Sequence, residues 1–204
     1  MKKKLLAGLA IGVMMFGMDR AANASPITLV DQGATWQYSV LSSDLWPIWN
    51  TANYSSFDWS SATWLTGQAA FGNPYSLPYN TTWTANTDIA LQKTFNIDGL
   101  LSTPIILNVA SDNGFMVFIN GQQVAKENAE AYTSYWEYTL NLTTLGFLSP
   151  GQNIIQVLAE DHGGATFFDL KLTGDVAPVP EPATMLLMGT GLAGLIGARR
   201  RKKA

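Results

Sequence analysis

The sequence predicts an all-β sandwich between an apolar leader and an apolar tail. Three observations favour this fold class. Short runs in which apolar and polar residues alternate recur through the middle of the chain, and a period of two is typical of half-buried strands. Turn-forming Gly, Pro and Asn pairs separate these runs, and no long segment in this region has the helical period of 3.6. Short strands at this spacing are expected to pack as two sheets.

The first 24 residues have the three parts of a secretory signal peptide. Three lysines at residues 2–4 precede an apolar stretch at residues 5–16, and the small-residue motif Ala22-Asn23-Ala24 follows. The apolar stretch is too short for a stable membrane helix. We therefore expect export of the protein, with cleavage after Ala24.

Five alternating sets of apolar residues predict strands in a single domain at residues 25–177. In chain order they are Ile105, Leu107 and Val109; Phe115, Val117 and Ile119; Trp136, Tyr138, Leu140 and Leu142; Ile155, Val157 and Ala159; and Phe168, Leu170 and Leu172. Each set shares one face of its strand, because side chains alternate across a strand. Asn113-Gly114 separates the first two sets, and Asn120-Gly121 predicts a two-residue type I′ hairpin. Trp36 and Trp64 lie in similar patterns and are also expected in the core.

The domain is much more acidic than the full chain. The full chain has a formal net charge of −3, but nine of its 12 Lys and Arg lie in the two terminal segments. Lys93, Lys126 and Lys171 remain in the domain against 13 acidic residues, which leaves a net charge of −10. So few cations cannot neutralise phosphates, so nucleic acid is excluded as a partner. The chain has no cysteine, so a packed core rather than disulfides must stabilise it.

The end of the chain combines three parts in a fixed order. Pro180-Glu181-Pro182 comes first, an uncharged apolar run follows at residues 183–198, and the basic cluster Arg199, Arg200 and Arg201, with two lysines, comes last. As a helix the run would be roughly 24 Å long, a little shorter than the roughly 30 Å hydrocarbon core. The positive-inside rule keeps the basic cluster in the cytoplasm, which places the domain on the other side of the membrane.

This tail resembles the PEP-CTERM sorting signal of Gram-negative bacteria, in its Pro-Glu-Pro triplet, short Gly-rich apolar helix and terminal arginines. The resemblance implies that residues 178–204 supply a single transmembrane helix, which anchors the protein transiently. It also implies that an exosortase cuts near Pro180, Glu181 and Pro182, after export across the inner membrane. The product would then reach the cell surface or the extracellular matrix. The alternative is an ordinary tail anchor with a proline spacer.

The domain resembles galactose-binding-like jelly rolls, which include the sugar-binding domains of glycoside hydrolases. The resemblance rests on five segments that follow one another in this order: TWQYSV, FDWSSATWLTGQAAFG, TDIALQKTFNI, LNVASDNGFMVFINGQQV, and LSPGQNIIQVLAED with FFDLKL. It implies a jelly-roll β-sandwich, and some members of this group bind carbohydrate, often with a structural calcium ion. The best candidates for calcium ligands are Asp112-Asn113-Gly114 and Glu160-Asp161, for which a plain turn and surface solubility are the alternatives.

Loop aromatic residues are the candidate carbohydrate-binding residues. Trp46 and Trp49 fall in one stretch rich in Pro, Asn and Ser, and Tyr79 and Trp83 fall in another. Neither stretch alternates like a strand. Flat rings can stack on the apolar faces of sugars while neighbouring asparagines bond to hydroxyl groups. The alternative is that these rings close the two ends of the sandwich as a second small core.

The sequence predicts no catalytic residue. The single histidine, His162, has no partners at the spacing of a zinc site or a catalytic triad, and no G-x-S-x-G motif is present. Nothing in the sequence places a carboxylate pair about a sugar ring. We therefore expect a non-enzymatic exported protein that binds carbohydrate or exopolysaccharide. The alternatives are a secreted hydrolase that uses His162 or a carboxylate pair, and a scaffold that binds another surface protein.

Overall fold

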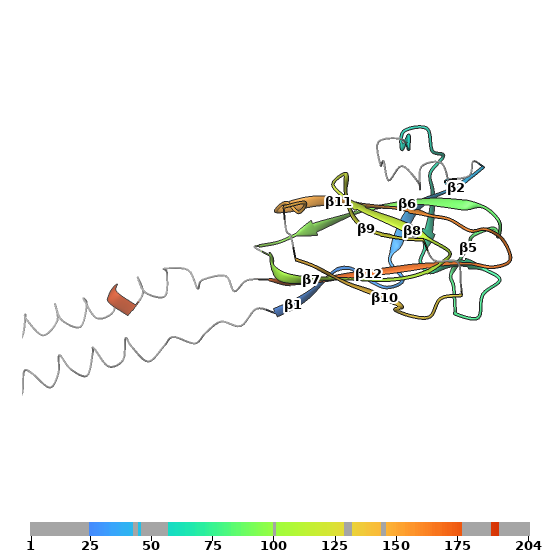
Figure 1. The fold of residues 1–204 in the computed structure, drawn as a ribbon. Coiled ribbons are helices and arrows are strands. Elements are labelled where there is room, and N and C mark those ends of the chain that lie inside the picture. The colour runs from blue at the N-terminus through green and yellow to red at the C-terminus, as the bar shows by residue number, and fades with distance from the viewer. Residues whose placement is uncertain are drawn as a thin grey trace, which may run out of the picture. The chain divides into compact units, whose positions relative to one another are not determined.

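The structure is a computed structural model that describes residues 25–42, 45, 57–99, 101–128, 132–143, 146–176 and 189–191. Ser25–Ala177 forms one compact unit. Its strands are β1 (Ser25–Val30), β2 (Thr35–Leu41), β3 (Leu65–Gln68), β4 (Phe71–Asn73), β5 (Thr81–Thr82), β6 (Asp88–Ile97), β7 (Leu101–Asp112), β8 (Phe115–Ile119), β9 (Gln122–Glu127), β10 (Tyr138–Leu142), β11 (Gly151–Ala159) and β12 (Thr166–Val176). They lie in two layers (Figure 1), so the predicted all-β sandwich is confirmed.

Each layer is a sheet of six strands. Sheet A has the order β10-β7-β12-β4-β5, with β1 also paired to β12, and sheet B has the order β3-β2-β6-β11-β8-β9. Among the described pairings, β4 with β5 is parallel and the others are antiparallel. Strand β12 pairs with β7 along one edge, while β4 and β1 share its other edge. It is therefore bonded on both sides along most of its length.

The predicted alternation places the core between the sheets. Leu107 and Val109 of β7 lie opposite Leu172 and Leu170 of β12, and all four side chains are fully buried. On β8, all five residues are buried rather than every second one. The sequence FMVFI is apolar throughout, so both faces of this strand can be covered.

The two ends of the sandwich differ. Ser25, the first residue of β1, pairs with Val176, the last residue of β12, at the end that we call the proximal end. The opposite, distal end is where Phe167 pairs with Asp112 and where the turn between β7 and β8 lies. The first residue of β1 and the last residue of β12 therefore both lie at the proximal end.

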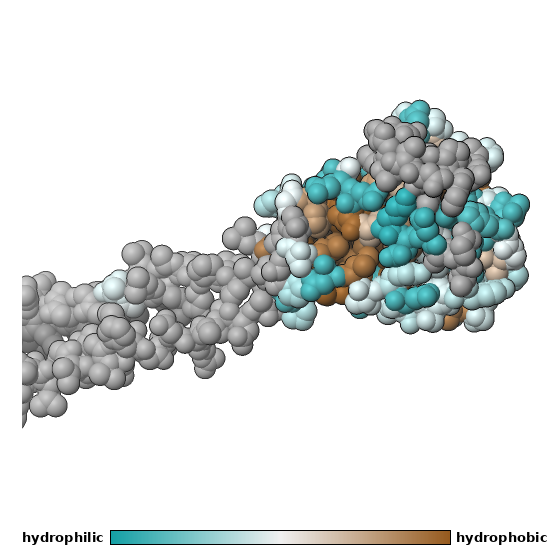
Figure 2. Space-filling model, in the orientation of Figure 1, coloured by the Kyte–Doolittle hydropathy of each residue, from teal (hydrophilic) through white to brown (hydrophobic). Residues whose placement is uncertain are grey.

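One side of the sandwich is open between the edge strands β9 and β10. A cavity of about 290 Å³ lies there, and its lining combines glutamines of β9 with Val124, Leu142 and Phe147. Figure 2 shows an apolar patch on this side, between largely hydrophilic surfaces. The apolar contents of the sandwich thus approach solvent at this opening.

Several predicted features lie outside the described residues. These are the signal peptide at residues 1–24 with its cleavage site after Ala24, the triplet at residues 180–182, and the arginines at residues 199–201. Of the predicted membrane helix, residues 189–191 are described, and they are helical. In the described part of the chain, no helix is long and apolar enough to cross a membrane.

The predicted hairpin joins β8 to β9. Asn120 and Gly121 both have positive φ angles, of 50° and 80°, as a type I′ turn requires. The side-chain nitrogen Nδ2 of Asn120 donates to the Phe147 carbonyl and to Asn153 Oδ1, both at 2.8 Å. Its Oδ1 accepts the Ile154 N–H at 3.0 Å. Asn120 therefore closes the turn and ties it to β11.

Replacing Asn120 should separate these two roles. Asn120→Gly keeps the turn conformation but removes the side-chain hydrogen bonds, so we expect a loss of about 1–3 kcal/mol in the free energy of unfolding. Asn120→Ala should cost about 1 kcal/mol more, because alanine also resists a positive φ. Urea unfolding of both variants measures this, with the exposed Asn96→Ala as control. Equal costs for the two variants would contradict a role of the backbone conformation.

Candidate functional site

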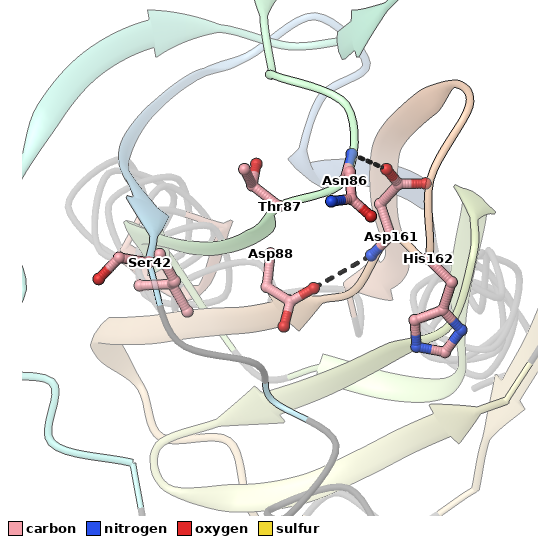
Figure 3. Close-up of a pocket in the computed structure, with 7 residues that line it drawn as sticks. Ser42, Asn86, Thr87, Asp88, Asp161 and His162 are labelled. Carbon is pink, nitrogen blue, oxygen red and sulfur yellow. Dashed lines mark hydrogen bonds between the residues drawn. The ribbon is translucent and has the colours of Figure 1, made fainter.

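A polar pocket of about 420 Å³ lies at the distal end of the sandwich (Figure 3). It forms where three segments meet: the end of β2, the start of β6, and the connection that follows β11. The residues that line it are Leu41, Ser42, Asn86, Thr87, Asp88, Asp161 and His162.

Two buried carboxylates hold the walls of this pocket together. Asp88 accepts the Leu45 N–H at 2.6 Å through Oδ2 and the Asp161 N–H at 3.1 Å through Oδ1. Asp161 in turn accepts the Asn86 N–H through Oδ2. Both residues are only 5% exposed, and burial raises the pKa of Asp161 although the Asn86 and Gly163 amides oppose this. Both carboxylates therefore accept hydrogen bonds from backbone N–H groups of the surrounding loops. Such charge-assisted hydrogen bonds are stronger than neutral ones, so they hold the loops in place.

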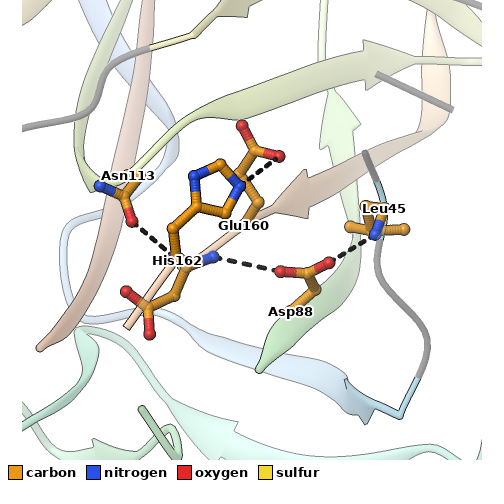
Figure 4. Close-up of polar contacts among 6 residues, drawn as sticks. Leu45, Asp88, Asn113, Glu160 and His162 are labelled. Atoms are coloured by element: carbon orange, nitrogen blue, oxygen red, sulfur yellow. Dashed lines mark hydrogen bonds and ion pairs between the residues drawn. The ribbon is translucent and has the colours of Figure 1, made fainter. Parts of the chain in front are cut away.

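His162 also lines this pocket, and Figure 4 shows its polar contacts with neighbouring residues. Its Nε2 is 3.5 Å from Oε2 of Glu160, whose side chain is fully buried, whereas the imidazole is 38% exposed. The His162 N–H donates to Asn113 Oδ1, and the Asn113 N–H donates to the Glu160 carbonyl, both at 2.9 Å. His162 is thus partly exposed, and its backbone is fixed to the turn between β7 and β8.

The two segments considered as calcium ligands do come together. Asn113 and Glu160 are neighbours, but the Asn113 side-chain oxygen and the Glu160 carbonyl each accept a backbone N–H. Within the described residues, no group of three or more acidic or histidine side chains is arranged to hold a metal ion. The Asn113 side-chain oxygen and the Glu160 carbonyl, both of the kind that hard cations prefer, therefore serve to hold the loops.

A second feature lies on the outer face of sheet A. Phe167 points away from the main core, which contains its neighbour Phe168, and packs in a separate cluster with Ala70 and Ala110. Aromatic rings from the β4–β5 connection and from the segment before β10 cover it. We call this group the tyrosine platform, and its members are Tyr75, Tyr79, Tyr132, Tyr135 and Trp136.

Ring contacts hold the platform together. The Phe167 ring stacks on Tyr75, with centroids 4.8 Å apart, and meets the edge of Tyr135 at 5.5 Å. Tyr132 lies 5.6 Å from Tyr75 and is 74% exposed. Gly72 allows the close approach of Tyr79, because a Cβ at this position would be 2.8 Å from the Thr166 carbonyl and 3.3 Å from the Tyr79 ring. The platform therefore combines a fixed base with an exposed upper ring.

Hydrogen bonds and carboxylates lie beneath the rings. The Tyr75 hydroxyl accepts the Thr133 N–H at 2.6 Å, and burial together with Asp112 raises the pKa of Tyr75. Asp169 is 1% exposed, and its Oδ1 accepts the Leu170 N–H at 2.9 Å. Burial raises the pKa of Asp169 to about 6, although the Leu170 amide and the Tyr135 hydroxyl lower it. The platform thus covers a buried carboxyl group whose pKa is raised.

The structure corrects one predicted ligand-binding residue. Trp83 has no exposed surface, and its Nε1 donates to the Thr87 carbonyl at 3.0 Å, so its ring stabilises the turn before β6 and cannot stack on a ligand. Tyr79 is 36% exposed and belongs to the platform. Trp46 and Trp49 lie outside the described residues.

Other predicted aromatic positions are distributed between the two clusters. Trp36 is in the main core, as predicted, and Trp64 is half-buried against Trp59 with parallel rings 6.2 Å apart. Trp136 precedes β10 and packs in the platform cluster instead of the main core, which corrects the predicted position. Tyr132 and Tyr135 were not predicted; the aromatic density of AYTSYWEY is the sequence signal that marks them.

Stability should depend on pH through Asp169. A carboxyl group whose pKa rises from 3.8 to about 6 on folding stabilises the protein below pH 3.8 and loses about 3 kcal/mol of that contribution as pH rises through 6. Asp169→Asn should remove this loss. Urea unfolding at pH 4 and pH 8 measures the difference, with the exposed Asp98→Asn as control. A difference between wild type and Asp169→Asn that does not change with pH would contradict the assignment.

The comparisons with known proteins concern different parts of the chain. Several structures of Ruminococcus gnavus β-glucuronidase are similar: a crystal structure of the enzyme (8% identity, TM-score 0.47) and its complexes with D-glucaro 1,5-lactone (9%, 0.47) and D-glucuronic acid (10%, 0.47). Each alignment covers 74% of this chain, but this chain spans only 29–30% of those proteins. No curated protein matches the sequence. Residues 178–202 match the PEP-CTERM protein-sorting motif, so the C-terminal segment carries this sorting signal.

Proposed function

We propose that this protein is an exported, non-enzymatic component of the cell surface or extracellular matrix of a Gram-negative bacterium, and that it binds polysaccharide. The sorting motif at residues 178–202 is the observation that carries the proposal. Under it, the signal peptide directs the chain across the inner membrane, and the C-terminal apolar segment anchors it transiently. An exosortase then cuts near Pro180-Glu181-Pro182 and releases the sandwich, whose finer classification we propose to be a galactose-binding-like jelly roll.

The tyrosine platform is the proposed contact with polysaccharide. Exposed rings whose orientation is fixed can stack on the apolar faces of sugars without a large loss of side-chain entropy. Tyr132 and Tyr79 supply the exposed surface, and Tyr75 and Phe167 support them from below. The platform covers Phe167 in the distal part of β12, at the opposite end of this strand from Val176. A chain attached through its C-terminus would therefore present these rings away from the attachment.

The non-enzymatic character of the protein is proposed because the pocket carboxylates are engaged elsewhere. Asp88 and Asp161 accept backbone N–H groups from the loops around the pocket. One arrangement favours the alternative of a hydrolase: His162 lines the pocket and faces the buried Glu160. A screen of glycosides and esters decides between these functions. Turnover that is lost in the His162→Ala variant would support the hydrolase.

The sorting motif gives a direct test of processing. Replacement of Pro180, Glu181 and Pro182 by alanine should block cleavage, because the triplet is the proposed substrate of the exosortase. Fractionation of the producing cells should then find the full-length chain in the membrane and little of the shortened form outside. The control is the same triple replacement at Gln122, Gln123 and Val124 of β9. Unchanged release of the triplet variant would contradict processing at this site.

Binding should depend on the exposed rings. Tyr132→Ala and Tyr79→Ala should each weaken binding to exopolysaccharide from the producing cells by about two- to tenfold, since each loses one stacking contact. Titration calorimetry of the full chain in mild detergent measures this. Leu65→Ala is the control, because Leu65 is 53% exposed but lies on β3 of the other sheet. Absence of binding by the folded wild type would contradict the proposed function.

A further inference from the structure

Two acidic residues lie under the tyrosine platform on the same face of sheet A. Asp112 lies directly opposite Phe167, and Asp169 lies directly opposite Ala110. Residues opposite each other in an antiparallel pair project from the same face, so both carboxylates flank the buried ring on which the platform rests. Asp112 is 5% exposed and Asp169 is 1% exposed.

The rings connect these carboxylates to the exposed surface. Besides burial, Asp112 raises the pKa of Tyr75, whose ring contacts the exposed Tyr132. Asp169 likewise adds to burial in raising the pKa of Tyr135. Asp169 is almost completely buried, so water screens its negative charge only weakly. Charges in such a low-dielectric position act on their surroundings more strongly than charges in water.

The net charge around the platform is negative. Asp31 is close enough to Asp169 to raise its pKa, and Lys171 lies two residues along β12 on the same face. Three acidic groups thus accompany one basic group. The whole domain has three lysines against 13 acidic residues, so its wider field has the same sign.

Aromatic faces add to this field. The π-face of tyrosine is negative, and a cation above it gains about 0.5–1 kcal/mol at an exposed site. A cation over Tyr132 would gain from the ring and from the carboxylates below, whereas an anion would be repelled by both. The platform therefore distinguishes ligands of the same shape by their charge.

We propose that the tyrosine platform selects polysaccharides whose sugar units carry an ammonium group over neutral ones, and neutral ones over polymers of acidic sugars. The inference rests on the proposed function, because it names the class of polysaccharide that the same surface takes. Stacking on Tyr132 and Tyr79 supplies affinity for any sugar with an apolar face. Asp112 and Asp169 supply the preference for the cationic one.

Three polymers test the selection: N-trimethylated polyglucosamine, which has a fixed positive charge, neutral N-acetylated polyglucosamine, and an uronic acid polymer. Titration calorimetry of the full chain in mild detergent should give affinities that fall in this order, by about two- to fivefold at each step. Added salt should reduce the differences between these affinities, because it screens the exposed charges of the polymers. The neutral polymer should respond least to salt.

Removal of the Asp169 carboxylate tests whether this residue causes the preference for the cationic polymer. Asp169→Asn should reduce affinity for the trimethylated polymer by about two- to fivefold more than affinity for the neutral polymer. Asp98→Asn is the matched control, since Asp98 is exposed and follows the proximal end of β6. Between pH 8 and pH 5 the preference of the wild type should shrink as Asp169 gains a proton, while that of Asp169→Asn changes less.

The outcomes separate the two proposals. Failure of all three polymers to bind would overturn the proposed function itself. Binding without the predicted order, or an equal effect of Asp98→Asn, would overturn the charge selection and leave polysaccharide binding intact. Binding of polylysine with the same dependence on Asp169 and on Tyr132 would also overturn it, because the surface would then take any polycation.

Discussion

Strand β12 is the constraint on which the rest of the structure depends. It is bonded along both edges, to β7 on one side and to β4 and β1 on the other. Its two faces have different roles. Phe168, Leu170 and Leu172 project into the space between the sheets and help to form the main core, whereas Phe167 projects outward and supports the tyrosine platform. Because side chains alternate on a strand, a one-residue change of register would exchange these two sets and abolish both.

Buried polar groups organise the distal end in place of disulfides. The chain has no cysteine, and the loops there are held by carboxylates that accept backbone N–H groups. An unpaired backbone donor in such a place would cost about as much as a lost hydrogen bond, so each carboxylate compensates the burial of the loops. The same chemistry limits function. Oxygens that satisfy the fold at Asp88 and Asn113 are committed to it, whereas Asp169 also places a buried negative charge on the outer face of sheet A.

The strands were predictable, and the platform was not. Alternation marked the inward sets of β7, β11 and β12, and Asn120-Gly121 marked the hairpin through its need for two positive φ angles. The sequence prediction was wrong for Trp83. Its segment has no strand alternation and therefore predicted an exposed loop, whereas the ring is buried and its indole N–H donates to the Thr87 carbonyl. The platform brings Tyr75 and Tyr132 together over Phe167. These residues are far apart in the sequence, and only the pairing of β4 and β7 with β12 makes them neighbours.

The pairing of β1 with β12 also has a mechanical consequence. Ladder hydrogen bonds run perpendicular to the strands, so tension along β12 loads its bonds to β7, β4 and β1 together in shear. That is the loading when the chain is held beyond Val176 and pulled from the distal end. Tension between Ser25 and Val176 would instead peel the β1–β12 ladder open one residue pair at a time. Resistance to force therefore depends on where the sandwich is gripped, and a tether beyond Val176 with a load at the distal end of β12 uses the stronger direction.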